Sequence, residues 1–207
     1  MTEKLWSPIQ GLQFYPSMHR YRMNKKWMMW SISQIIDTRD QRTKEIHERT
    51  RSEWEPRGNT VHACLEAFLQ GKPYDPGKYK DWVVPLLSDD LWNRWTAVAC
   101  EFRLVDLDFV GGIGGSADCI IRHNETGRLV LADLKTLSAS GRKRNVSLQL
   151  GGYLSLLSKC RPEIKIHKCM VIWSKPNEVL TTSYTTEECL SAYEKQKQIF
   201  FENLPKI

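Results

Sequence analysis

One segment, GGIGGSADCIIRHNETGRLVLADLKT, holds two apolar runs on either side of a single turn, and each run carries an aspartate. The runs at 117–122 and 129–135 contain the Val, Ile and Leu residues typical of strands, and HNETGR contains the residues typical of a turn. The segment therefore predicts an antiparallel hairpin. If the residues directly before and after the turn pair with each other, Asp118 lies opposite Asp133.

Two aspartates that face each other across a hairpin need an explanation, because like charges in this position repel. Their Cβ atoms would lie about 4.5–5.5 Å apart, a separation at which two carboxylates can share a cation. Lys135 projects from the same strand face as Asp133, whereas Leu134 points into the core. The pattern is compatible with a metal site beside a lysine. In an arbitrary hairpin the more common arrangement is an exposed face whose aspartates meet solvent, with Lys135 as an ordinary ion-pair partner.

The other segments show helical and strand patterns. Helices are expected at 31–50, at 57–73 with Asn59 as N-cap, at 88–100, at 144–159, and from a capping box of Thr185 and Glu188 to about residue 203; further strands are expected at 101–110, 166–175 and 179–185. Gly151 and Gly152 fall within one expected helix and allow another backbone to approach closely. This order predicts an α/β fold with a central mixed sheet flanked by helices.

No linker rich in Gly, Ser or Pro divides the 207 residues, so one domain is expected. Within it, 1–57 is expected to be a helical and basic N-terminal segment, 58–175 the core, and 176–207 a C-terminal strand and helix. No run approaches the roughly 18 apolar residues that span a bilayer, and no secretory signal pattern is present. We expect a soluble intracellular protein without membrane contact, in a bacterial or phage-infected cytoplasm or in a mitochondrion.

Basic residues outnumber acidic residues by 30 to 24, and the net charge of +6 favours an acidic partner such as nucleic acid. The excess is concentrated in three runs, at 19–27, 39–51 and 141–145. In the first run, Tyr21 and Trp27 alternate with cations, a mixture suited to phosphate contact and base stacking on a single strand. In the third, the candidate phosphate contacts are Arg142, Lys143 and Arg144. A solvated basic surface explains the same runs equally well.

Six cysteines are spread singly along the chain, at positions 64, 100, 119, 160, 169 and 189. Because no Cys-x-x-Cys pair is present, the sequence argues against a zinc ribbon, a redox pair and a local iron–sulfur motif. We expect these thiols to be reduced and mostly buried.

An ordered set of motifs surrounds the hairpin. Its members are a GxxxHxxxE pattern at Gly58, His62 and Glu66, then Asp118, then DLKT at 133–136, then QLGGY with Gln149 and Tyr153. In this order the set resembles the RecB-type branch of the PD-(D/E)XK nuclease superfamily, which includes the mitochondrial genome maintenance exonuclease and phage relatives. The similarity covers about residues 19–175. Ala117 stands where the superfamily name has proline, a common departure in this branch.

The resemblance implies a restriction-endonuclease-like core and a role for each matched residue. It implies metal ligation by His62, Asp118, Asp133 and the backbone carbonyl of Leu134. It implies a catalytic set of Lys135, Asp118 and Asp133. It also implies that Gln149 and Tyr153 support the site and contact DNA. The four cysteines of relatives with an iron–sulfur cluster have no counterpart here, so no such cluster is expected.

The chemistry of this ligand set favours Mg²⁺ or Mn²⁺ over zinc. Carboxylates and a carbonyl supply the oxygen ligands that Mg²⁺ prefers, and the imidazole nitrogen also suits Mn²⁺. Glu66 lies one turn after His62 on the same helix face and is a second-tier candidate for holding an outer water, although an ordinary surface carboxylate explains it equally well. Glu101, at the start of a strand, is a second candidate of this kind.

The predicted function is metal-dependent hydrolysis of DNA phosphodiester bonds by an exonuclease. We expect it to act on single-stranded DNA or DNA ends, because no base-reading module is present while basic and aromatic residues flank the core. The setting would be replication, repair or recombination, with a helicase or another protein of these processes as a candidate partner. The alternatives are a structure-specific endonuclease and a non-catalytic DNA-binding protein of the same fold. Digestion polarity and the number of metal ions stay open.

Overall fold

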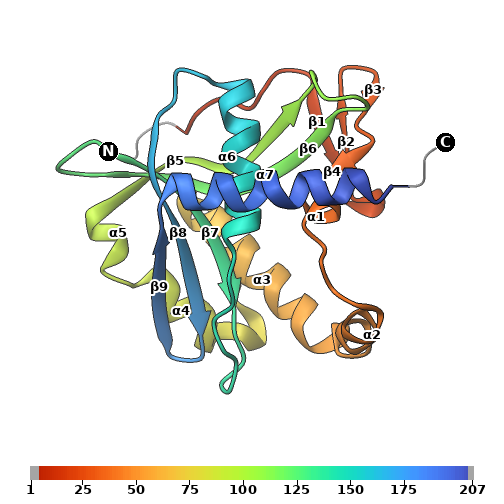
Figure 1. Cartoon of the computed structure of the whole chain (residues 1–207). Helices are drawn as coiled ribbons and strands as arrows, with labels where there is room; N and C mark the ends of the chain where they lie inside the picture. Colours follow the sequence, from red (N-terminus) through yellow and green to blue (C-terminus); the bar gives the residue numbers. More distant parts are fainter. Residues whose placement is uncertain (1–4, 205–207) are drawn as a thin grey trace.

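The computed structural model describes residues 5–204, and its centre is a mixed β-sheet with helices on both faces (Figure 1). The strands are β4 (Trp30–Ser31), β5 (Trp95–Asp106), β6 (Ile113–His123), β7 (Leu129–Thr136), β8 (Ile166–Lys175) and β9 (Glu178–Tyr184). They follow the order β4, β6, β7, β8, β9, and β5 also pairs with β6. The β4–β6 and β7–β8 pairs are parallel and the others are antiparallel. The predicted α/β fold with a mixed sheet between helices is confirmed.

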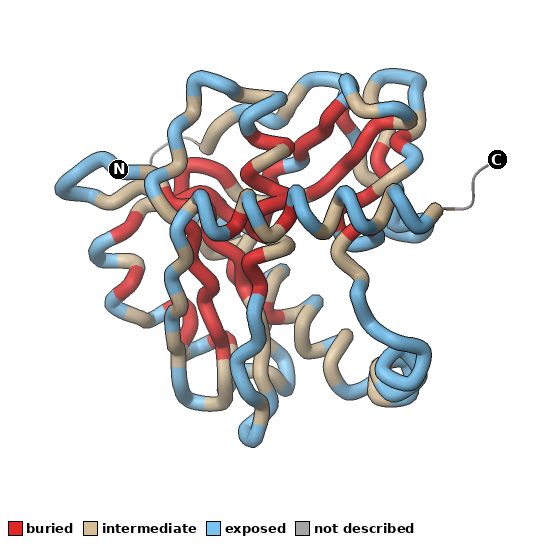
Figure 2. The backbone as a smooth tube through the Cα atoms, in the orientation of Figure 1, coloured by how far each residue is buried: buried red, intermediate tan, exposed pale blue. Residues whose placement is uncertain are grey.

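Helices cover the sheet in two layers. The α-helices are α1 (Ile32–Ile35), α2 (Gln41–Arg49), α3 (Arg51–Leu69), α4 (Lys80–Leu87), α5 (Leu91–Arg94), α6 (Ser147–Cys160) and α7 (Thr186–Glu202). Alternate side chains of a strand point to opposite faces, so Leu134 joins the core under α3 and α4, and Leu131 joins the core under α6 and α7. α7 lies across α6 (Figure 1), and the buried backbone is concentrated in the strands between the layers (Figure 2).

A small antiparallel sheet lies beside β4 and β6. Its strands are β1 (Leu12–Tyr15), β2 (Arg20–Met23) and β3 (Lys26–Trp27). Tyr21 is buried against Gly114 of β6, where a Cβ atom would overlap its ring. The N-terminal segment, predicted to be helical, therefore begins with strands. The physical reason is that His19 and Asn24 adopt left-handed backbone conformations, which reverse the chain between the strands.

The helix predicted at 31–50 is wrong as one element, because it is two helices separated by residues 36–40. Ser31 and Gln34 form a reciprocal capping box that starts α1. The side chain of Asp40 accepts a hydrogen bond from Thr43 N–H and starts α2. Each cap satisfies backbone N–H groups at a new helix N-terminus, so the segment forms two helices. The polar composition of the region did not indicate where either helix begins.

The next helix, α3, begins earlier than predicted. It starts at Arg51, so Asn59 is an exposed residue inside the helix and not its N-cap. Thr50 ends α2 and also precedes α3, and Arg51 Nη2 lies 2.8 Å from Glu55 Oε1, one turn later. This pair supports helical structure across the first turn, upstream of the apolar stripe that the pattern detects.

The helix predicted at 88–100 is mostly wrong, since only Leu91–Arg94 is α-helical there and β5 begins at Trp95. The segment TAVAC contains two alanines, which favour helix in isolation. Pairing with β6 overrides that preference, because Ala97, Val98 and Ala99 are all buried in the sheet. The strand predicted at 101–110 likewise ends at Asp106.

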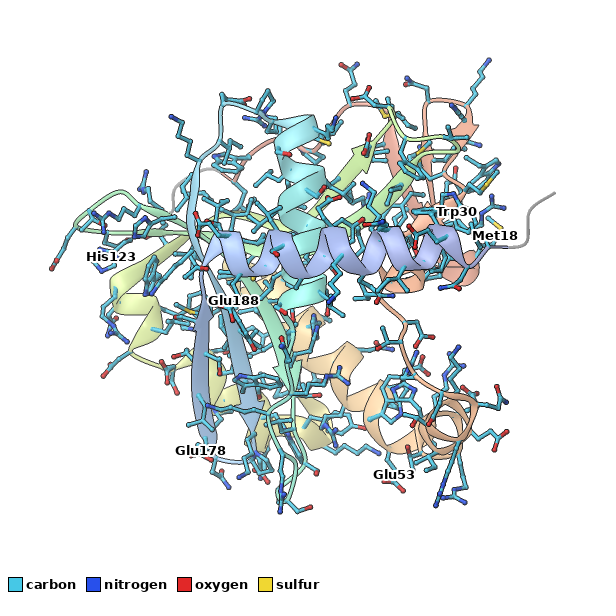
Figure 3. All side chains as sticks on the ribbon, viewed as in Figure 1. Met18, Trp30, Glu53, His123, Glu178 and Glu188 are labelled. Atoms are coloured by element: carbon cyan, nitrogen blue, oxygen red, sulfur yellow. The ribbon has the colours of Figure 1, made fainter. Side chains whose placement is uncertain are left out.

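Several element boundaries agree with the sequence. β8 spans Ile166–Lys175, as predicted. The side chain of Thr185 accepts a hydrogen bond from Glu188 N–H at 3.0 Å and starts α7; Figure 3 labels Glu188 near this end. All six cysteines are free thiols, four buried and two half-buried. Within residues 5–204, no helix is both long enough and apolar enough to cross a bilayer.

The close approach predicted at the paired glycines is confirmed. A Cβ atom at Gly151 would collide with the backbone carbonyl of Cys189 in α7, and one at Gly152 would collide with Ile32 of α1. Neither glycine has a positive φ, so the requirement is for space and not for backbone freedom. These two residues let α6 lie directly against both neighbouring helices.

Changing Gly151 to alanine is therefore expected to lower the free energy of unfolding by about 1–3 kcal/mol, the usual cost of overpacking. Urea unfolding followed by tryptophan fluorescence measures the loss. The matched control is Gly58→Ala in α3, where an added Cβ meets no atom within 4 Å, and this change is expected to stabilise by about 0.5–1 kcal/mol. Equal stability of the two variants would contradict the packing described.

Candidate metal centre and its cleft

The hairpin strands β6 and β7 diverge at the two predicted aspartates. They pair from Arg122↔Leu129 to Cys119↔Ala132, which is the predicted register. Beyond this point β6 continues alongside β5 and β7 alongside β8. Leu134 therefore has no backbone pairing partner on β6, and its N–H donates instead to a β6 side chain, at Asp118 Oδ2, at a distance of 2.6 Å. A fork in the sheet results, with a catalytic candidate on each branch.

Three side chains meet at this fork. His62 of α3, Glu101 of β5 and Asp118 of β6 each offer one ligand atom, and these atoms lie within 4.8 Å of one another. His62 Nδ1 is 3.6 Å from Asp118 Oδ2, and the two side chains are 30% and 13% exposed. The group thus combines one imidazole and two carboxylates that solvent can reach.

Glu101 has an unusual backbone and an unusual charge environment. Its φ of 45° is left-handed, a conformation that costs energy for a residue with a side chain. Burial, together with the charges of Asp118 and Glu66, raises the pKa of Glu101 to about 7. Ser116 Oγ donates to its Oε2 at 3.4 Å. A cation among these carboxylates would relieve their mutual repulsion.

Asp133 is completely buried and pairs with Lys135. Among the described residues, the three-residue group contains Glu101 and not Asp133. Asp133 is 0% exposed, and its Oδ2 is 2.6 Å from Lys135 Nζ, which is 16% exposed. Apart from this contact with Lys135, neither carboxylate oxygen of Asp133 has a hydrogen-bond partner within residues 5–204. Burial raises the pKa of Asp133, while the ammonium of Lys135 opposes the rise.

The side chain of Leu134 points to the face of the sheet that the two-residue strand period predicts. Its side chain is fully buried in the core under α3 and α4. The N–H and C=O of one strand residue project from the same strand edge. Since Leu134 N–H donates to Asp118, the carbonyl of Leu134 also faces the fork. A carbonyl in this orientation is what the predicted metal ligation by Leu134 requires.

A cleft of about 760 Å³ surrounds the three-residue group. One wall is the small sheet with α1, which contributes Phe14, His19, Tyr21 and Ser33. A second is formed by α2 and α3, with His47, Trp54, Glu55, Arg57, Gly58, Asn59, His62 and Glu66. The end of β7, the loop after it and α6 complete the cleft with Lys135, Thr136, Arg142, Arg144, Gln149 and Tyr153.

The predicted DNA-binding residues divide between the cleft and other surfaces. Gln149 Nε2 donates to Tyr153 Oη at 2.7 Å inside the cleft. In the basic loop, Arg142 and Arg144 line the cleft, whereas Lys143 lies against β9, 3.5 Å from the carbonyl oxygen of Thr181.

The two aromatic residues of the basic N-terminal run also separate. Tyr21 lines the cleft. Trp27 lies outside its lining and contacts Tyr15, with ring centroids 4.8 Å apart. Arg20 and Arg22 lie over the Trp27 ring, at 5.1 and 5.5 Å from its centroid.

Sequence reasoning missed several residues that line the cleft. The rings of His47 and Trp54 lie 4.1 Å apart, at the junction of α2 and α3. Phe14 and His19 come from the small sheet. Arg57 directly precedes Gly58 of the GxxxHxxxE motif, and this neighbouring position is the one sequence signal that could have identified it. The others are brought together only by tertiary packing.

Comparisons with known proteins give little information on function. No family model matches the chain, and no curated protein matches it. Among solved structures, the chain is similar to one titled "Crystal structure of SSO0001", with 18% identity and a TM-score of 0.44 over 86% of this chain and 78% of that chain. A similarity at this level says nothing about what the chain binds or catalyses.

Proposed function

We propose that this chain is a divalent-metal-dependent deoxyribonuclease of the PD-(D/E)XK type, acting as an exonuclease on single-stranded DNA or DNA ends. The observation that carries the proposal is the group of His62, Glu101 and Asp118 within 4.8 Å, in the same cleft as Lys135. Such an activity would serve replication, repair or recombination inside a cell, where a helicase supplies single strands.

The residues at the fork fit a hard divalent cation. Oxygen ligands from Glu101 and Asp118 suit Mg²⁺, and the nitrogen of His62 also suits Mn²⁺. The buried carboxylate of Asp133, which contacts Lys135 and no other hydrogen-bonding group within residues 5–204, is a further potential ligand. When bound, the cation supplies Lewis-acid polarisation of a phosphate and lowers the pKa of a coordinated water.

The protein's own groups provide positioning and charge. The carboxylate of Asp133 holds the ammonium of Lys135 at the edge of the cleft. From there the ammonium can orient a water molecule and offset charge that develops on a phosphate. Leu134 N–H fixes one oxygen of Asp118. The hydrogen bond between Gln149 and Tyr153 fixes the polar side chains that α6 contributes to the cleft.

The rest of the cleft favours DNA binding without base readout. Arg142 and Arg144 offer charge to backbone phosphates, and the rings of Phe14 and Trp54 offer faces to bases. Phosphate contact and stacking are both independent of sequence. This combination supports an exonuclease over a sequence-reading enzyme.

The test compares DNA topology and metal dependence. End-labelled linear single strands and closed circular single strands are incubated with Mg²⁺, Mn²⁺ or EDTA. We expect the linear strands to be degraded with either metal, and both substrates to stay intact in EDTA. Cutting of the circles would instead indicate an endonuclease, and retention of DNA without cleavage would indicate a binding protein.

A further inference from the structure

Arg57 lies at the edge of the cleft, in the first half of α3. Its Nε–H donates to Thr136 Oγ1 at 3.3 Å. Its guanidinium carbon is 5.5 Å from the ring centroid of Trp82, and Trp82 Nε1–H donates to the carbonyl of Leu137 at 2.7 Å. Thr136 and Leu137 directly follow Lys135, so the guanidinium is positioned by the end of β7.

This cation lacks an acidic partner. Within residues 5–204, no carboxylate lies at ion-pair distance from Arg57, and Glu55 in the same turn is paired with Arg51 at 2.8 Å. The terminal Nη groups of Arg57 donate to no described residue. Burial lowers the pKa of Arg57, although Tyr79 and Glu53 act in the opposite direction. A half-buried cation that faces a cleft and has no paired acid is available to an anion from outside the chain.

We propose that Arg57 binds the phosphate that is cleaved, through its two Nη groups. This inference rests on the proposed function and assigns that site a further residue. A guanidinium presents a planar fork that matches two phosphate oxygens, which an ammonium cannot do. With Nε engaged by Thr136 and one face against Trp82, the Nη groups are the donors left for the cleft.

The first test changes Arg57 to glutamine and to lysine. On linear single-stranded DNA, Arg57→Gln is expected to lower kcat by about 10²–10³-fold, the size typical of one lost electrostatic contact. Arg57→Lys should keep more of the rate than Arg57→Gln, because lysine retains the positive charge. Its rate should stay below that of the wild type, because an ammonium cannot bind two phosphate oxygens as a planar guanidinium does. Full activity of Arg57→Gln would overturn the assignment.

The matched control is Arg128→Gln. Arg128 is an exposed residue on the turn between β6 and β7. Figure 3 shows how far this turn is from α3: His123, at the start of the turn, lies on the opposite side of the molecule from Glu53. This variant is expected to stay within about twofold of wild type. An equal loss in Arg128→Gln would mean that net charge, and not the position of Arg57, sets the rate.

A second substrate separates phosphate binding from a structural role. It carries one uncharged methylphosphonate at the linkage that the wild type cuts first. This group should slow the wild type strongly and Arg57→Gln much less, because the charge that Arg57 would bind is already absent. Equal slowing of both proteins would refute the inference.

A third variant covers a failure of the Arg57 variants to fold. Thr136→Val removes the acceptor for Nε, and it should show a smaller rate loss with a reduced response to the methylphosphonate. An unchanged rate and response would again refute the inference. If the wild type cleaves DNA and these variants match it, only the role of Arg57 fails. If the wild type cleaves no DNA, the proposed function fails as well.

Discussion

Replacing Asp118 with asparagine is expected to lower the rate of DNA cleavage by about 10²–10³-fold and to leave folding nearly unchanged. Asparagine keeps an oxygen that can accept the hydrogen bond from Leu134 N–H, which Asp118 Oδ2 now accepts at 2.6 Å. It removes the negative charge that attracts a divalent cation. Single-turnover cleavage of linear single-stranded DNA in excess Mg²⁺ or Mn²⁺ measures the effect.

The matched control is Asp108→Asn, which removes the same charge outside the cleft. Asp108 is 79% exposed and pairs with Lys159 at 3.1 Å. Its variant should cleave at the wild-type rate, because an exposed ion pair contributes little to stability and none of its atoms line the cleft. Wild-type activity in Asp118→Asn, with unchanged circular dichroism, would place the metal centre elsewhere.

Replacing Lys135 with methionine is expected to reduce both cleavage and stability. Cleavage should fall by about 10²–10⁴-fold, the usual contribution of a proton-transfer group. The free energy of unfolding should fall by about 3–5 kcal/mol, because Asp133 is completely buried and would lose its only cation within ion-pair distance in the described chain. Urea unfolding in EDTA measures stability without a contribution from metal.

A double variant distinguishes the two effects. Lys135→Met with Asp133→Asn removes both charges, so it should regain much of the lost stability and none of the lost cleavage. An exposed pair provides the comparison, since Lys159→Met should change stability by less than about 0.5 kcal/mol. If Lys135→Met is as stable as the wild type, the buried carboxylate is not charged in the folded protein.

The elements predicted correctly are those whose local pattern and tertiary environment agree. β8 contains the continuous apolar run Cys169–Trp173, and the sheet buries this run on both faces. The hairpin register followed from the turn alone. The errors arose where the two disagree: Ala97 and Ala99 favour helix in isolation, yet β6 holds them in a strand. Such a preference is reversed by pairing with residues that are distant in sequence.

The part of the candidate site that lies on β7 could be predicted from the two-residue period of a strand. That period correctly places Lys135 beside Asp133 and Leu134 in the opposite core. The strand period does not reveal that β6 and β7 separate beyond Cys119. Where they separate, Glu101 of β5 lies close to His62 and Asp118. The wall formed by α2 and α3 depends on packing across the whole chain, and no local pattern encodes it.

The hydrogen bond between Leu134 and Asp118 has a consequence for reading related sequences. A homologue that had lost catalysis would still need an acceptor at position 118, because an orphaned buried N–H costs about 1–3 kcal/mol. An aspartate at position 118 in a homologue is therefore evidence of the same fold, and not by itself evidence of enzymatic activity. The side chains of His62 and Glu101 accept no such bond from the main chain within residues 5–204. Their replacement is therefore the better sign that a descendant has become inactive.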